Sequence, residues 1–139
     1  LVACVVADTG LVGIDAELDQ RSLVVDPLLD DVCSPRERRE LAGLTGRART
    51  SRFLDFWTLK EAFLKACGLG ISRDLTRISA TITDDCIIRL EVPPDLARPD
   101  MSFRIFRIDD GGRVALAKTG PLKSQEIKVE TLVVQVKVM

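Results

Sequence analysis

The chain has 139 residues, of which 46% are hydrophobic and 29% charged, and its formal net charge is −1. This composition is typical of a single globular domain, and no apolar run approaches the roughly 18 residues of a membrane-spanning helix. The absence of histidine and tyrosine excludes Ser-His and Cys-His catalysis and histidine metal sites, so chemistry must rest on carboxylates, lysine, arginine or hydroxyls.

The four cysteines lie far apart, at positions 4, 33, 67 and 86, and form no C-x-x-C motif. We therefore expect reduced thiols rather than paired-cysteine metal or redox sites. The apolar start of the chain lacks the basic residues and the length of a signal peptide. These features predict a cytoplasmic protein whose partners include neither a membrane nor a nucleic acid.

The first seven residues are apolar on both alternating faces, which predicts a strand covered on both sides. Asp8-Thr9-Gly10 predicts a turn after it. The chain has no initiator methionine and opens directly into this strand. Because a domain rarely starts in a buried strand, we expect that further residues precede Leu1 in the natural protein.

Residues 11–18 alternate in character, which predicts a half-buried strand. The even-numbered residues of this stretch are apolar and should face the core. Gly13, Asp15 and Glu17 should then lie together on the non-core face, because successive side chains of a strand point to opposite sides. The strand therefore presents two neighbouring carboxylates.

Ser34-Pro35-Arg36-Glu37 combines an N-cap serine, a proline at the first helical position and the glutamate of a capping box. It predicts a helix that runs to about Leu44. Residues 34–52 hold six arginines against two glutamates, whereas residues 8–31 hold seven acids against one base. The pattern fits a basic docking face beside an acidic metal site, and a solvated surface is the alternative.

A second helix is predicted from about Thr50 to Cys67, because apolar residues recur at helical spacing and Gly68 provides a C-terminal stop. Glu61 lies one turn after Trp57 and one turn before Lys65, so these three side chains share a face.

After Gly70 the pattern changes to a period of two. Strands are predicted at 78–82, 88–92, 102–108, 113–118 and 127–138, with turns at 84–85 and 109–112. The predicted fold class is α+β, with a small, mostly antiparallel sheet packed against a long helix.

The charged residues of the strand and the second helix suit one kind of chemistry. Asp15 and Glu17 with Glu61 would supply oxygen ligands for a magnesium ion, and Lys60 and Lys65 would supply positive charge for a pyrophosphate. The alternative is equally simple: exposed acids on a strand and an ordinary Glu61–Lys65 helix ion pair.

Two motifs, about forty residues apart, resemble those of the surfactin-synthetase-type phosphopantetheinyl transferases. The first is Val12-Gly13-Ile14-Asp15-Ala16-Glu17, and the second runs from Trp57 to Lys65 as W-T-L-K-E-A-F-L-K. The resemblance implies a pseudo-dimer of two α+β halves with coenzyme A in the cleft between them. Residues 1–120 would form the C-terminal half. Residues 121–139 would be a tail to which the resemblance assigns no role and which could add a strand. The shorter, trimeric acyl-carrier-protein synthases fit the motifs less well.

The resemblance also implies roles for individual residues. Asp15, Glu17 and Glu61 would bind Mg²⁺ with the pyrophosphate of coenzyme A, the substrate. Lys60 and Lys65 would neutralise phosphate charge, and Lys65 would stabilise the leaving adenosine bisphosphate. Glu61, or a metal-bound water, would take the proton from a serine of an acyl or peptidyl carrier protein.

Two functions from different classes follow. The first is a transferase that works with an N-terminal half-domain or as a homo-oligomer. The second is a non-catalytic half-domain that keeps the fold and associates with a partner chain.

Overall fold

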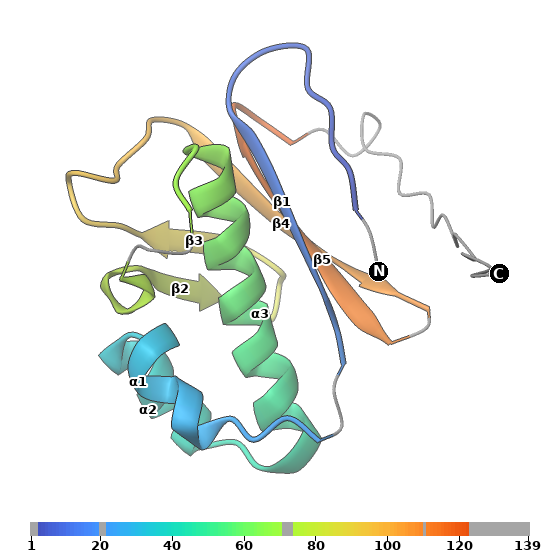
Figure 1. Ribbon diagram of the computed structural model, residues 1–139, viewed down its shortest axis with the longest axis vertical. Helices are drawn as coiled ribbons and strands as arrows, with labels where there is room; N and C mark the ends of the chain where they lie inside the picture. The colour runs from blue at the N-terminus through green and yellow to red at the C-terminus, as the bar shows by residue number, and fades with distance from the viewer. Residues whose placement is uncertain (1–2, 20–21, 71–73, 110, 123–139) are drawn as a thin grey trace, which may run out of the picture.

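The computed structural model describes residues 3–19, 22–70, 74–109 and 111–122, and its fold class is α+β, as predicted (Figure 1). A three-stranded antiparallel sheet has the order β1-β5-β4, and a two-stranded antiparallel sheet pairs β2 with β3. The strands are β1 (Val12–Leu18), β2 (Ser79–Ile82), β3 (Ile88–Glu91), β4 (Met101–Ile108) and β5 (Gly112–Thr119). The helices are α1 (Leu29–Val32), α2 (Pro35–Ala42) and α3 (Gly46–Ala66), with 3-10 turns η1 (Asp26–Leu28) and η2 (Leu75–Arg77).

The 21-residue helix α3 lies in the middle of the molecule. The three-stranded sheet packs on one side of it, and α1, α2 and the two-stranded sheet lie on the other (Figure 1). Because α3 is covered on both sides, nearly all its side chains from Phe53 to Leu64 are buried. The core therefore surrounds this helix, and the elements on either side take their positions from it.

The helix α2 begins as the sequence predicts. The Ser34 hydroxyl accepts a hydrogen bond from the backbone N–H of Glu37, and the Glu37 carboxylate accepts one from the backbone N–H of Ser34. The reciprocal pair satisfies two amide donors that the first helical turn leaves free. The helix ends at Ala42, slightly before the predicted Leu44, and α3 begins at Gly46 rather than at Thr50.

Residues 3–7 form no strand, although their apolar character predicts one. Among the described residues, no backbone hydrogen bond joins this segment to a neighbour. Apolar content favours burial but supplies no partner strand, and a ladder needs one. Val6 is 87% exposed, which is the opposite of the burial expected there.

The strands β2 to β5 begin and end within one residue of their predicted bounds, and the turn between β4 and β5 lies where Asp109 and Gly111 predict it. The predicted strand at 127–138 lies outside the described residues. In the part of the chain that the structure describes, no helix is long and apolar enough to cross a membrane.

Candidate active site

A close backbone contact fixes β1 against α3. Gly13 is buried, and a Cβ built on it would lie 2.1 Å from the carbonyl oxygen of Ala62 and 2.3 Å from the amide nitrogen of Ala66. Only glycine fits such an approach without displacement. The face of β1 that carries Gly13, Asp15 and Glu17 is therefore turned towards α3. The prediction that it is the non-core face is wrong, because the glycine lets this face meet the helix.

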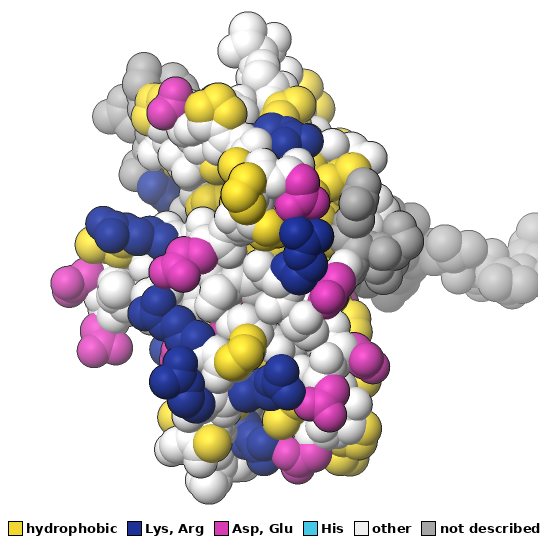
Figure 2. Space-filling model, turned by 90° about the vertical axis from the view of Figure 1, so that its left-hand side faces the viewer, with side chains coloured by type: hydrophobic (Ala, Val, Ile, Leu, Met, Phe, Trp, Pro, Cys, Tyr) yellow, Lys and Arg dark blue, Asp and Glu magenta, His cyan; other side chains and the backbone are white. Residues whose placement is uncertain are grey.

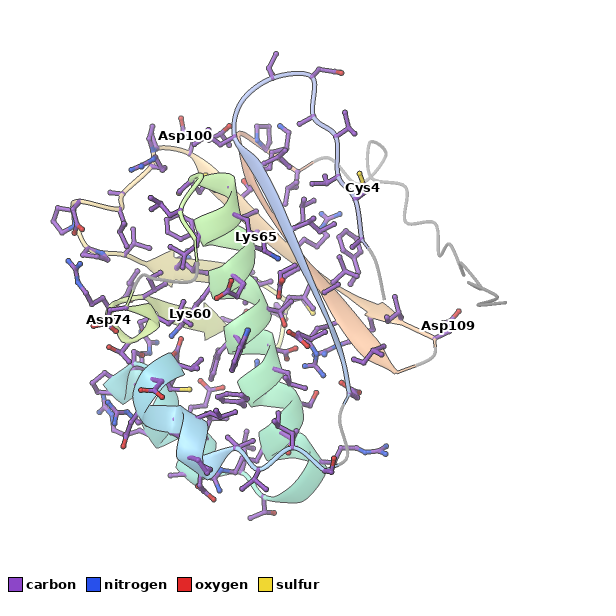
Figure 3. The ribbon with its side chains drawn as sticks, in the orientation of Figure 1. Cys4, Lys60, Lys65, Asp74, Asp100 and Asp109 are labelled. Carbon is purple, nitrogen blue, oxygen red and sulfur yellow. The ribbon has the colours of Figure 1, made fainter. Side chains whose placement is uncertain are left out.

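Asp15 and Lys65 form an ion pair across this contact. The Lys65 Nζ lies 2.5 Å from Asp15 Oδ1, and the side chains are 49% and 11% exposed, respectively. The second carboxylate oxygen of Asp15 is buried and has no hydrogen-bond partner. Lys65 points from α3 towards β1, as Figure 3 shows. Asp15 thus has one oxygen neutralised by Lys65 and one oxygen without a partner.

Glu61 lies beside this pair and is only 4% exposed. Its Oε1 is buried without a hydrogen-bond partner. Burial, followed by the negative charge of Asp15, raises the pKa of Glu61, and the Lys65 ammonium offsets part of the rise. Burial and Asp15 also raise the pKa of Glu17. The three carboxylates are therefore close enough to repel one another, which a bound cation would relieve.

The donor set suits a hard cation such as Mg²⁺, which prefers carboxylate oxygens. Two buried oxygens without partners, Asp15 Oδ2 and Glu61 Oε1, also fit such an ion. Among the described residues, however, no three acidic, cysteine or histidine side chains already form a metal cage. A cation held by Asp15, Glu17 and Glu61 together would therefore require side-chain rotation.

Lys60 lies elsewhere. It is fully buried, and its ammonium donates to Glu37 Oε2 at 2.6 Å, to the carbonyl oxygen of Val32 at 2.7 Å and to that of Leu75 at 3.0 Å. Lys65 faces β1, whereas Lys60 points away from that strand (Figure 3). The prediction that Lys60 contacts a phosphate is wrong for this structure, because all three ammonium protons of Lys60 are donated to acceptors inside the protein.

Glu37 completes the buried pair, and the sequence analysis noted it only as a capping residue. Its Oε2 accepts from Lys60 and from the Ser34 amide, and its Oε1 accepts from the Ala80 amide at 2.7 Å. The pair therefore joins α1, α2, α3, η2 and β2. No local pattern connects Glu37 to Lys60, so only the fold reveals this role.

Arg113 was also missed. This fully buried residue is the second of β5 and lies opposite Glu17. Its guanidinium donates to Asp55 Oδ1 at 2.5 Å, and also to Asp19 and to the carbonyl oxygen of Ser51. Its positive charge partly counteracts the raised pKa of Glu17. The signal was an arginine directly before the apolar run Val114–Ala117.

The arginines of α2 lie on the surface. Arg36 pairs with Glu91 at 3.2 Å and Arg38 with Asp30 at 2.6 Å, and Arg39 is exposed. Figure 2 shows basic side chains spread over one face of the molecule, with acidic and apolar groups between them. The face is basic in part, but its ion pairs reduce its net positive charge.

Comparison with known proteins places the chain in a family. The profile of the 4'-phosphopantetheinyl transferase superfamily matches residues 11–118. The chain is 33% identical over 94 residues to the 4'-phosphopantetheinyl transferase HetI of Nostoc sp., an alignment that covers 68% of this chain and 39% of HetI. It is 25% identical over 130 residues to the 4'-phosphopantetheinyl transferase of Bacillus subtilis, covering 94% of this chain and 56% of that protein.

The fold resembles solved structures of acyl-carrier-protein synthases. The structure of a holo-(acyl-carrier-protein) synthase from Bacillus anthracis in complex with CoA (3',5'-ADP) superimposes with a TM-score of 0.64 at 20% identity, covering 79% of this chain and 96% of that one. The Chronobacterium ammoniagenes ACPS-CoA complex gives a TM-score of 0.60 at 18% identity, covering 83% and 100%.

These structural matches show the fold, and the profile shows the family. The chain spans 27% to 56% of the length of the curated relatives it matches. Because the profile matches residues 11–118, the chain belongs to the 4'-phosphopantetheinyl transferase superfamily.

Proposed function

We propose that the protein transfers the 4'-phosphopantetheine arm of coenzyme A to a serine of an acyl or peptidyl carrier protein, with Mg²⁺ as the metal. The observation that carries this proposal is the close contact between β1 and α3. Asp15 and Glu17 on the strand face Glu61 and Lys65 on the helix, and two of the carboxylate oxygens are buried without partners. Family membership supports the same reaction.

Asp15, Glu17 and Glu61 would hold the metal, which neutralises pyrophosphate charge when bound. The serine oxygen forms a bond to the proximal phosphorus of coenzyme A, and the bond from that phosphorus to adenosine bisphosphate breaks. Glu61 accepts the serine proton, a role that its raised pKa favours because a stronger base accepts a proton more readily. Lys65, half exposed on a long flexible stem, places its ammonium beside the leaving phosphate.

The carrier protein would dock beside α2, where Arg36, Arg38 and Arg39 lie. Carrier proteins with an acidic recognition helix would complement this face. The chain would act as the C-terminal half of a pseudo-dimer, with residues 1–120 as the half-domain, so coenzyme A would also contact an N-terminal half or a second copy. Lys60 is left out of the site, because its ammonium is buried.

The test incubates the chain, with any sequence that flanks it in the natural protein, with coenzyme A, Mg²⁺ and an apo carrier protein. Mass spectrometry should show the carrier gaining one phosphopantetheine. Glu61→Gln should reduce the rate by about 100-fold or more, because it removes both a ligand and a base. Asp109→Asn, which changes an exposed acid in the turn between β4 and β5, serves as the matched control.

An active Glu61→Gln variant would mean that another group carries the chemistry. If the wild-type protein forms a stable complex with a second chain but transfers nothing, the non-catalytic association function replaces the transferase.

A further inference from the structure

The Lys65 ammonium is bound to one of the two oxygens through which Asp15 could hold a cation. Its Nζ is 2.5 Å from Asp15 Oδ1, a charge-assisted contact that uses one of the two oxygens of this carboxylate. The other oxygen, Asp15 Oδ2, is buried and has no hydrogen-bond partner. The Lys65 charge also offsets part of the raised pKa values of Glu17 and Glu61, and Arg113 adds to this effect at Glu17. Lys65 is therefore the direct counter-ion of Asp15 and a nearby positive charge for the other two carboxylates.

A divalent cation bound to Asp15 would lie within a few ångströms of this ammonium, whichever carboxylate oxygen it uses. Two positive charges a few ångströms apart repel each other, and the repulsion is stronger near a protein surface than in bulk water. Lys65 is 49% exposed and has a flexible four-carbon stem, so it has room to turn outwards. Lys60 cannot replace it, because the Lys60 ammonium is held inside the protein by three acceptors.

We propose that Lys65 is an exchangeable counter-ion: cation binding at Asp15 displaces its ammonium, which then becomes available to a phosphate group of the substrate. The proposal rests on the proposed function and adds to it a coupling between the metal and the anion. The cation and the phosphate then bind with positive cooperativity, because the first releases the group that holds the second.

The direct consequence concerns the affinity for a divalent cation. Removing Lys65 should strengthen divalent cation binding when no anion is present, since the competitor is gone. Partly exposed ion pairs contribute little, so the expected gain is about fivefold in Kd, or ~1 kcal/mol. If Lys65 served only to bind phosphate, its removal would not change metal affinity beyond the general effect of losing one positive charge.

The experiment titrates the chain with Mn²⁺ in the absence of any anion ligand and measures Kd by isothermal calorimetry. Wild type is compared with Lys65→Met and with Lys118→Met. The control removes the same charge from β5, where the Lys118 ammonium donates to the carbonyl oxygen of Thr119. Lys65→Met should bind Mn²⁺ about fivefold more tightly than both other proteins. Equal affinity of the two variants would overturn the proposal.

A second measurement follows Lys65 itself. The εCH₂ resonance of Lys65 is observed by NMR and assigned by its loss in Lys65→Met. Its chemical shift should change on saturation with Mg²⁺ and change again when inorganic pyrophosphate is added. A resonance that stays in place when Mg²⁺ saturates the protein would overturn the exchange. If the wild type and both variants all fail to bind Mn²⁺, the carboxylate metal site of the proposed function is wrong. If all three bind equally, the site stands and only the exchange fails.

Discussion

Gly13 lies so close to α3 that a Cβ added to it would be 2.1 Å from the carbonyl oxygen of Ala62. This contact sets the spacing between the residue pair on β1, Asp15 and Glu17, and the helical residues Glu61 and Lys65. A strand held away from the helix by a side chain would carry its carboxylates away as well. The glycine is therefore part of the site, although it has no functional group.

Gly13→Ala should lower both the free energy of unfolding and the affinity of the carboxylate site for a divalent cation. Overpacking against helix backbone costs about 1–3 kcal/mol, because the strand or the helix must move. Chemical denaturation measures this loss, and Mn²⁺ titration of the folded variant should show weaker binding. Gly43→Ala is the matched control, since a Cβ there meets its nearest neighbour, the Glu40 carbonyl oxygen, at an ordinary 3.5 Å. Unchanged stability of Gly13→Ala would show that β1 is free to shift.

The buried pair of Lys60 and Glu37 predicts a strong asymmetry among variants. Lys60→Met alone leaves the Glu37 carboxylate buried without its cation, which should cost about 3–5 kcal/mol of unfolding free energy. Combining Lys60→Met with Glu37→Gln removes both charges, keeps a side-chain oxygen as acceptor for the Ser34 or Ala80 amide, and should recover part of that loss. Urea unfolding of the two single variants and the double variant measures the coupling. Additive losses would mean that the two side chains act independently.

Local signals predicted much of the fold, and non-local contacts explain the misses. The capping box at Ser34 and the turn at Asp109 depend on neighbouring residues, so the sequence shows them directly. The orientation of β1 was wrong because its two carboxylates indicated a solvent-facing side. The contact of Gly13 with α3 turns that side inwards. The motif that indicated Glu61 also indicated Lys60, whose partner Glu37 lies 23 residues away in the sequence.

The raised pKa of Glu61 predicts a pH-dependent cost to stability. The folded state binds the Glu61 proton more tightly than the unfolded state does. Between the unfolded value of about 4.5 and the raised pKa, the folded state therefore holds more protons, and the free energy of unfolding falls as pH rises.

Glu61→Gln removes this titration, so the variant should become more stable than wild type as pH rises through that window. Urea midpoints of both proteins across about pH 4 to 8 give the difference. Glu40→Gln, which changes an exposed glutamate, should show a far smaller trend. A difference between wild type and Glu61→Gln that does not vary with pH would mean that Glu61 has the same proton affinity in both states.

Charge reversal on α2 should weaken carrier-protein docking without affecting coenzyme A. Changing Arg36, Arg38 and Arg39 to glutamate should raise KM for an acidic carrier protein by about threefold to tenfold. High salt should reduce the difference, since exposed charges act through screened, long-range attraction. Arg89→Glu, an exposed reversal on β3, is the control. A salt-independent loss of affinity for both substrates would indicate a misfolded α2 instead.

The chain should associate with a second chain, because it exposes apolar side chains along its N-terminal segment and first strand. Val6 is 87% exposed and Leu18 on β1 is 44% exposed. Exposed apolar side chains favour an interface, and β1 is an edge strand of its sheet among the described residues. Light scattering at micromolar concentration should therefore give a mass above that of one chain.

Val6→Glu combined with Leu18→Glu should shift this equilibrium to the monomer, because two charges would have to be buried in the interface. Ile87→Glu places a charge on another exposed apolar residue, 51% exposed before β3, and should leave the mass unchanged. A wild-type chain that is monomeric in the same experiment would show that this apolar surface has no partner in solution. An equal effect of Ile87→Glu would place the interface on the β2–β3 hairpin instead.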